Sequence, residues 1–263
     1  MEQARATVPG AQAIARAAAL LRAVSAAGSD GIGLQSLARQ TDISRSTAHR
    51  LLRALRAEGL LDQDADSARW LPGPELFLMG SAAAPRYDMA HLARDIVRSL
   101  AVTTEESAFL SVRRGDETVC VLREEGAFPI RSFVLSEGVR FPLGIASAGL
   151  AIMSFLPDED VDAYLSRHPE LSRRWGASHD AGALRTRIRE TRDRGYAVNP
   201  GLIVAGSWGA GAAVFDHHGR PEWALSLTGV EFRFGPDRLP QLGRMLLSHA
   251  HQLTMRIQAS HRP

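Results

Sequence analysis

The pattern of apolar and polar positions divides the chain into a short helical part and a longer part of mixed elements. In the first part, apolar residues recur at helical spacing over three segments, which are 11–27, 34–40 and 44–58. Ser44 is a good N-cap for the third helix, and Gly59 stands where its C-terminal cap belongs. Apolar dipeptides at 60–61 and 70–71 flank an acidic run and predict a small hairpin. The predicted order is therefore helix, helix, helix and hairpin.

The longer part alternates between patterns typical of helices and of strands. Helical spacing of apolar residues covers 89–100, 147–155, 158–166, 183–194 and 239–257. Strand-like runs cover 108–113, 117–123, 130–135, 211–215 and 222–228. The first two runs are joined across Gly115-Asp116 and the last two across a turn at 216–220, so both pairs indicate hairpins. Antiparallel hairpins with helices packed on them predict an α+β fold.

The second and third predicted helices have the pattern of a helix-turn-helix. They are joined by only three residues, Thr41, Asp42 and Ile43. Ile43 is apolar and can fill the angle between the helices. Asp42 stands where a left-handed backbone often requires glycine, and aspartate is one of the few residues tolerated there. The turn chemistry therefore agrees with the motif.

The third helix leaves a polar and basic face outside. Because its apolar stripe must face the core, the residues turned outward are Arg45, Ser46, Thr47, His49, Arg50 and Arg53. In this motif the N-terminal half of the helix enters the major groove, where arginine can bond a guanine edge with two hydrogen bonds. A solvated basic face in an ordinary helical domain is the alternative. The cap, stripe, turn and following hairpin together favour DNA binding, with the hairpin as a wing that offers Arg69 to a phosphate.

Composition narrows the class of protein and adds little about its partner. The chain has 263 residues, 45% of them hydrophobic, and a formal net charge of +2, which fits a globular protein with one or two domains. Cys120 is the single cysteine, so an internal disulfide and a multi-cysteine zinc site are excluded. No run of about 18 apolar residues and no signal-like N-terminus is present, so we expect a cytoplasmic protein with no membrane contact. All 31 basic residues are arginine, and five of them lie in segment 34–58.

Short motifs along nearly the whole chain match those of one family in the same order. The N-terminal ones are Leu37-Ala38, Ser44, Ser46-Thr47-Ala48-His49-Arg50-Leu51-Leu52, Leu55, Glu58-Gly59 and Leu71-Pro72-Gly73-Pro74. The C-terminal ones are Gly138, Pro142-Leu143, Ala146-Ser147-Ala148-Gly149, Gly195-Tyr196-Ala197-Val198, Gly206, Val214-Phe215-Asp216, Gly219 and Ala224-Leu225-Ser226-Leu227-Thr228-Gly229. With these motifs the chain resembles the IclR-type bacterial transcriptional regulators.

The resemblance implies an organisation for the chain and partners for it. We expect a disordered N-terminus at 1–10, a winged helix-turn-helix at 11–73, a linker helix at 74–86 and a GAF-like antiparallel-sheet effector domain at 87–263. The segment Ser81 to Arg86 is the natural hinge. The resemblance also implies double-stranded DNA with a palindromic operator, a small-molecule effector, and homodimers that often pair into tetramers. No cofactor or metal is expected.

The resemblance also implies where the effector binds. Carried over to this sequence, the pocket is formed by residues of three segments, which are Ser147, Ala148, Asn199, Ser207, Trp208, Gly209, Ser226 and Thr228. Free N–H groups at the helix start near Ser147 favour a carboxylate. The family usually has acidic residues where this chain has Asn199, Gly201 and Leu202, so the pocket is more suited to an anion or a neutral ligand, and an organic or aromatic acid is our hypothesis for the effector. Trp208 could stack on an aromatic ligand, and Arg131 is either its counter-ion or an exposed strand arginine.

Two other classes of protein stay open at this point. One is a repressor with a vestigial effector domain that needs no ligand. The other is an enzyme with an accessory winged helix, although Ser147 lacks the nucleophile-elbow spacing and no histidine or carboxylate is placed to serve it. The histidine pairs His217-His218 and His249 with His251 have no further metal ligands at suitable spacing. The arginines of 185–194 are interpreted as a solvated helix face rather than a second nucleic-acid patch.

Overall fold

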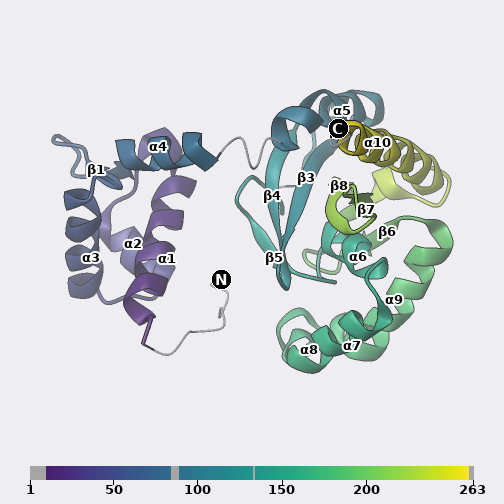
Figure 1. Cartoon of the computed structure of the whole chain (residues 1–263), viewed down its shortest axis with the longest axis horizontal. Helices are drawn as coiled ribbons and strands as arrows, with labels where there is room; N and C mark the ends of the chain where they lie inside the picture. Colours follow the sequence, from purple (N-terminus) through teal and green to yellow (C-terminus); the bar gives the residue numbers. More distant parts are fainter. Residues whose placement is uncertain (1–9, 84–88, 133, 261–263) are drawn as a thin grey trace. The chain divides into compact units, whose positions relative to one another are not determined.

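The computed structural model describes residues 10–83, 89–132 and 134–260 (Figure 1). The chain divides into two compact units, Met1–Asp88 and Met89–Pro263, which we describe one at a time. Of the predicted disordered N-terminus at 1–10, all but Gly10 lies outside the described residues, as does the second half of the predicted hinge at Ser81–Arg86.

The N-terminal unit is a winged helix. Its elements are α1 (Gln12–Ala26), a 3-10 turn (Gly28–Asp30), α2 (Leu34–Thr41), α3 (Arg45–Ala57), β1 (Leu61–Gln63), β2 (Trp70–Pro72) and α4 (Pro74–Ala83). Strands β1 and β2 form the predicted hairpin, and an isolated bridge joins Ile32 to Trp70. Trp70, Leu37 and Leu52 are fully buried in a core that every helix from α1 to α3 shares. Burial of these apolar faces against one another is what fixes the three short helices.

The C-terminal unit is built on one antiparallel sheet of six strands in the order β5-β4-β3-β8-β7-β6. Its strands are β3 (Ser107–Arg114), β4 (Glu117–Glu124), β5 (Arg140–Pro142), β6 (Ala197–Pro200), β7 (Ser207–Phe215) and β8 (Pro221–Val230). Its helices are α5 (Met89–Thr104), α6 (Ser147–Ser154), α7 (Asp158–Arg167), α8 (Leu171–Trp175), α9 (Ala181–Arg194) and α10 (Leu239–Ser260), with 3-10 turns at Ala177–His179 and Glu231–Phe234.

Each face of this sheet has its own apolar core. Helices α5 and α10 cover one face, where Leu110, Leu225 and Leu246 are fully buried (Figure 1). Helix α6 covers the other face, with α7 to α9 beyond it, and this second core holds Phe109, Ile152 and other buried residues. The strands between two covered faces therefore read as nearly continuous apolar runs.

The strand predicted over 130–135 is wrong. The described residues of this run form an irregular loop between β4 and β5, and the strand that pairs with β4 lies later, at Arg140–Pro142. Side chains of the loop bond elsewhere instead, since Arg131 Nε donates to the Phe128 carbonyl at 3.3 Å and Ser132 Oγ bonds Ser207 Oγ on β7. Val134 and Leu135 turn toward the core beneath the loop. The short strand β6 and the short helix α8 carried no clear periodic signal.

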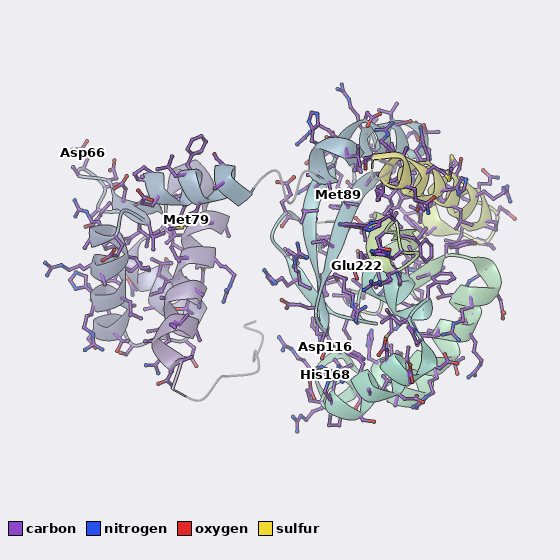
Figure 2. The ribbon with its side chains drawn as sticks, in the orientation of Figure 1. Asp66, Met79, Met89, Asp116, His168 and Glu222 are labelled. Atoms are coloured by element: carbon purple, nitrogen blue, oxygen red, sulfur yellow. The ribbon has the colours of Figure 1, made fainter. Side chains whose placement is uncertain are left out.

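The tip of the β3–β4 hairpin is tied to the end of α7. Asp116 accepts hydrogen bonds from Arg167 and lies 2.9 Å from His168 Nε2 (Figure 2). The Arg167 and His168 contacts lower the pKa of Asp116 against the opposing effect of its partial burial. The hairpin and the helical layer are thereby held together at the sheet edge.

Candidate functional sites

The turn between α2 and α3 has the geometry of a helix-turn-helix. Asp42 adopts the left-handed conformation, with φ 50° and ψ 38°, and its aspartate side chain is tolerated there as the sequence predicted. Ile43 is buried, and its N–H donates to the Ala38 carbonyl at 3.2 Å. Ser44 caps α3, because its Oγ accepts from Thr47 N at 3.4 Å and donates to Thr47 Oγ1 at 2.9 Å. The predicted turn and cap are both confirmed.

Helix α3 buries its apolar stripe and presents the predicted polar face to solvent. Ala48, Leu52 and Leu55 are buried, and Leu51 is half-buried. On the opposite side, the side chains of Arg45, Ser46, His49, Arg50 and Arg53 are exposed and that of Thr47 is half-buried. Such a face, projecting from the first turns of the second helix of the motif, has the geometry that enters a major groove.

The wing offers a weaker contact than the helix does. Arg69 is exposed, but its Nη1 donates to the Asp30 carbonyl at 2.8 Å, which ties the base of the wing to the preceding 3-10 turn. At the tip, Asp64 accepts from both Ser67 Oγ at 2.6 Å and Ser67 N at 2.8 Å, and these bonds lower the pKa of Asp64. The tip therefore stays anionic, which opposes close approach to phosphates.

In the C-terminal unit, the start of α6 lies directly on strand β7. This approach needs glycine, because a Cβ at Gly211 would lie 2.6 Å from the Ser147 carbonyl oxygen, and one at Gly209 would lie 3.1 Å from Ser147 Oγ. Residue Ala146 precedes the helix, and among the described residues no side chain caps it. The first N–H groups of α6 are thus left for another partner.

A cavity lies at this helix start, between α6, the sheet and the 125–139 loop. It brings together eight of the nine residues predicted for the effector, which are Ser147, Ala148, Asn199, Ser207, Trp208, Gly209, Ser226 and Thr228. Its free volume is about 30 Å³, which suffices for about two water molecules. None of the described residues that line it is charged.

Two hydroxyl groups in this cavity lack partners. Ser226 Oγ and Thr228 Oγ1 are buried, and neither has a hydrogen-bond partner in the part of the chain that the structure describes. They project from the same face of β8, since both residues pair with glycines of β7 (Gly211 and Gly209, respectively). A buried hydroxyl without a partner costs roughly 1–3 kcal/mol, so these groups are suited to a bound molecule.

Asn199 shapes the cavity through contacts with the backbone. Its Nδ2 donates to the Ile145 carbonyl at 2.8 Å and its Oδ1 accepts from Leu202 N at 2.9 Å. The residue thereby links β6 to the turn before α6. Arg187 holds the same turn from behind, since its Nη1 donates to the Gly144 carbonyl at 3.3 Å. Burial lowers the pKa of Arg187 to about 10.

Two of the predicted effector residues are placed differently from expectation. Trp208 borders the cavity, but its side chain packs against the α5/α10 core on the other face of β7, so the structure gives no support to stacking on a ligand. Arg131 does not line this cavity and does not lie on a strand. Its guanidinium contacts Glu125 and faces a separate hollow beside the cavity.

Sequence reasoning missed part of the lining. The lining also includes Ser111, Thr118 and Cys120 of the β3–β4 hairpin and Phe141 of β5. Cys120 is buried as predicted, and burial raises the pKa of its thiol to about 12, so it stays protonated. Side chains along β3 and β4 alternate between the two faces of the sheet, and this alternation was the sequence signal that could have found these residues. A register shift between Leu110 and Ser111 changes which of the side chains face the cavity.

Comparison with known proteins identifies the family of the chain. Residues 13–65 match the family described as "IclR helix-turn-helix domain", and residues 81–255 match "Bacterial transcriptional regulator IclR C-terminal". This chain belongs to the IclR family. It is 29% identical over 224 residues to the HTH-type transcriptional regulator KipR of Bacillus subtilis, an alignment that covers 85% of this chain and 89% of KipR.

Solved IclR-family structures share the fold. The IclR structure from Thermotoga maritima has a TM-score of 0.71 and 23% identity, covering 94% of this chain and 99% of that one. An IclR homolog from Microbacterium hydrocarbonoxydans, complexed with 4-hydroxybenzoate, has a TM-score of 0.74 and 19% identity, covering 94% and 99%. The fold class predicted from the sequence is confirmed. The family is one of transcriptional regulators, so the predicted class of function is confirmed as well.

Other candidate sites of this IclR-family chain have structural explanations. The basic helix α9 is paired with acidic neighbours, since Arg185 bonds Asp162 at 2.7 Å and Arg192 bonds Asp158 at 2.8 Å. Among the described residues, no group of three or more histidine, cysteine or acidic residues is placed to hold a metal. The same residues include no helix that is long and apolar enough to span a bilayer.

Proposed function

We propose that this IclR-family regulator binds a palindromic operator through α3 and that a small organic acid in the α6 cavity controls its affinity for the operator. The single observation that carries the ligand proposal is the pair of unpartnered hydroxyls, Ser226 Oγ and Thr228 Oγ1, in a cavity that also contains an uncapped helix start. A carboxylate accepts hydrogen bonds from hydroxyl groups and from the free N–H groups of a helix start. Because its partner is DNA, we place the protein in the cytoplasm.

The chemistry of the lining supports an acid with an apolar body. The lining combines hydroxyl groups and the start of α6 with the apolar side chains of Val134, Phe141 and Ile203. None of the lining residues that the structure describes is acidic, so none of them repels an anion. The 4-hydroxybenzoate held by the Microbacterium homolog has this combination of a carboxylate and an apolar ring. With about 30 Å³ of free volume, the cavity must widen to accept a molecule of that size.

The two alternative functions find less support. A ligand-independent repressor has no use for buried, unpartnered hydroxyls, which cost stability in the absence of a bound molecule. An enzyme that used Ser147 as a nucleophile would need a base within reach, and no histidine, aspartate or glutamate is among the described lining residues. Ligand binding that changes operator affinity without turnover separates the proposal from both.

Replacing Thr228 with valine should weaken binding of the acid about ten- to a hundredfold, because it removes a hydroxyl bonded to a charged group but keeps the shape. Calorimetric titration with benzoate, 4-hydroxybenzoate and short aliphatic acids measures the effect. Thr118→Val is the matched control, since Thr118 lines the same cavity but donates to the Phe141 carbonyl at 3.4 Å. Equal losses in the two variants, or no binding of any acid to the parent protein, would contradict the ligand assignment.

We also propose that the protein dimerises through the linker helix α4. Phe77, Leu78 and Met79 are 74%, 55% and 56% exposed on this helix. Three large apolar side chains in succession are thus left uncovered by the described residues, and Figure 2 labels Met79 among them. Exposed apolar groups in such numbers mark interaction surfaces. A palindromic operator needs two copies of α3 related by a two-fold axis, and a self-complementary contact of α4 supplies that axis.

Phe77→Glu should convert the dimer to monomers at micromolar concentration. Each protomer loses burial worth about 1.5–3 kcal/mol, and the two-fold symmetry doubles this to about 3–6 kcal/mol, so the dissociation constant should rise by two to four orders of magnitude. Sedimentation analysis measures the change. Val102→Glu, at a 67% exposed position on α5, is the control. If Phe77→Glu sediments as the parent does, α4 is not the dimer contact.

A further inference from the structure

A second hollow opens beside the effector cavity. It has a volume of about 390 Å³ and shares two lining residues, Val134 and Ser207, with the inner cavity. The rest of its wall comes from Arg131 and Ser132 of the 125–139 loop and from apolar residues that include Val204 and Val230. This outer hollow is more than ten times larger than the free space of the inner cavity, and unlike the inner cavity it has a charged lining residue.

A contact between two side chains lies where the two linings meet. Ser132 Oγ and Ser207 Oγ form a hydrogen bond of 2.5 Å, and Ser207 belongs to both linings. Each hydroxyl can rotate to another partner at little cost, because a hydroxyl both donates and accepts. A bound molecule that replaces this bond with its own polar group can therefore extend from one space to the other, while Ser132 Oγ keeps the bond that it accepts from Val134 N at 3.4 Å.

Arg131 is the cation of the outer hollow. Its guanidinium bonds the Phe128 carbonyl and contacts the Glu125 carboxylate, and its side chain is 34% exposed, whereas that of Glu125 is 48% exposed. An exposed ion pair of this kind contributes little, so a ligand carboxylate can take the place of Glu125. The bond to the Phe128 carbonyl orients the guanidinium before a ligand binds.

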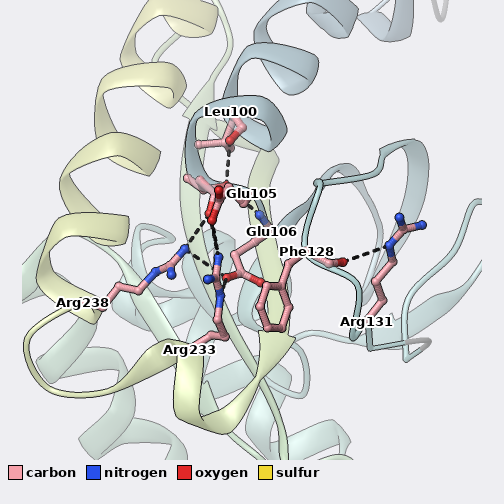
Figure 3. A network of polar contacts seen from close by, with 8 residues as sticks. Leu100, Glu105, Glu106, Phe128, Arg131, Arg233 and Arg238 are labelled. Atoms are coloured by element: carbon pink, nitrogen blue, oxygen red, sulfur yellow. Dashed lines mark hydrogen bonds and ion pairs between the residues drawn. The ribbon is translucent and has the colours of Figure 1, made fainter.

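The neighbourhood of Arg131 is anchored to the protein core. The Phe128 ring lies under the guanidinium of Arg233, with its centroid 4.1 Å from the guanidinium carbon (Figure 3). The same ring meets the ring of Phe232 edge-on. Arg233 is in turn bonded to the buried Glu106, with Nε to Oε1 at 2.6 Å. The cation therefore occupies a defined position before any ligand arrives, which lowers the ordering cost of binding.

We propose that the effector is a two-ended acid. One carboxylate binds at the α6 start and the Ser226 and Thr228 hydroxyls, the chain of the molecule passes the Ser132–Ser207 contact, and a second carboxylate pairs with Arg131 in the outer hollow. This inference rests on the proposed function, since the first carboxylate is the one assigned there. It explains why the inner cavity is too small for a whole ligand while a fixed arginine stands outside it.

Titration of the full-length protein with α,ω-dicarboxylates of four to eight carbons tests the inference, with the monocarboxylate of each length as the matched ligand. We expect at least one diacid to bind ten times or more tightly than its monoacid. Arg131→Gln should abolish that difference and leave monoacid affinity unchanged. Arg185→Gln removes a surface arginine of α9 that pairs with Asp162 of α7, and this control should preserve the preference for the diacid.

The outcomes separate this inference from the proposed function. If monoacids bind the parent protein and diacids bind no more tightly, or if Arg131→Gln keeps the diacid preference, the two-ended acid is wrong and the proposed acid site stands. If neither series binds, both are overturned. Binding of diacids that depends on Arg131 but not on Thr228 would place the ligand in the outer hollow alone and would also overturn the two-ended arrangement.

Discussion

Replacing Glu106 with alanine is expected to destabilise the effector domain by about 3–5 kcal/mol, the cost of removing one partner from a buried ion pair. Glu106 is 2% exposed and accepts from Arg233 Nε at 2.6 Å and from Arg238 Nη2 at 3.2 Å. Without it, the guanidinium of Arg233, whose side chain is only 13% exposed, loses its buried partner. The network joins the start of β3 to the segment that leads into α10 (Figure 3).

The environment of Glu106 explains why the loss is large. Burial raises the pKa of this carboxyl, and the two arginines act against the rise. Gly229 leaves the space that the carboxylate fills, since a Cβ there would lie 2.3 Å from Glu106 Oε2. Alanine therefore leaves both an uncompensated charge and an unfilled space, two separate causes of instability.

Glu105→Ala is the matched control for this prediction. Glu105 contacts the same Arg233, with Oε2 to Nη2 at 2.9 Å, but its side chain is 56% exposed, so its loss should cost less than about 1 kcal/mol. Urea unfolding of the three proteins, followed by circular dichroism, measures both values. Losses of equal size would mean that the buried network does not stabilise the domain more than an exposed pair does.

The helix-turn-helix could be predicted from the sequence because its determinants are local. The cap at Ser44, the left-handed Asp42 and the apolar stripe of α3 all act within a few residues of the chain, and the structure confirms each of them. The same holds for the β3–β4 hairpin, whose two-residue turn at Gly115-Asp116 sets its own register.

The effector cavity could be predicted only in part, because its residues are separated in the chain. The resemblance to a family brought together the segments near Ser147, Ser207 and Ser226, and the alternation along β8 agrees with it. The alternation along β7 places the Trp208 side chain on the other face of the sheet, although the residue itself borders the cavity. The run 130–135 imitates a strand, although its residues bond to Phe128 and Ser207 instead.

The network around Glu106 gave no sequence signal at all. Its members are more than a hundred residues apart, since Arg233 and Arg238 reach back to the end of α5. A buried glutamate looks in the sequence like any acidic residue near a turn. Such contacts become visible only when the sheet order is known, because β8 lies next to β3 and brings the following segment to that corner.

The double variant Arg45→Ala, Arg50→Ala should bind the operator about 30 to 20,000 times more weakly than the parent protein. Each arginine is exposed on the N-terminal half of α3, and one bidentate contact with a guanine edge contributes about 1–3 kcal/mol. A mobility shift on the upstream region of the gene itself, repeated at several salt concentrations, measures the loss. Binding to unrelated DNA should fall much less, because it depends on phosphate contacts rather than on base contacts.

Arg56→Ala, doubled with Arg39→Ala, is the matched control for net charge. Both arginines are exposed in the same motif, but Arg56 lies in the last turn of α3 and Arg39 on α2, away from the groove-facing half. The control should weaken specific and unrelated DNA alike, by less than the test variant weakens the operator. If the two double variants lose specific binding equally, the contribution of α3 is general electrostatic attraction, and the base-reading surface lies elsewhere on the winged helix.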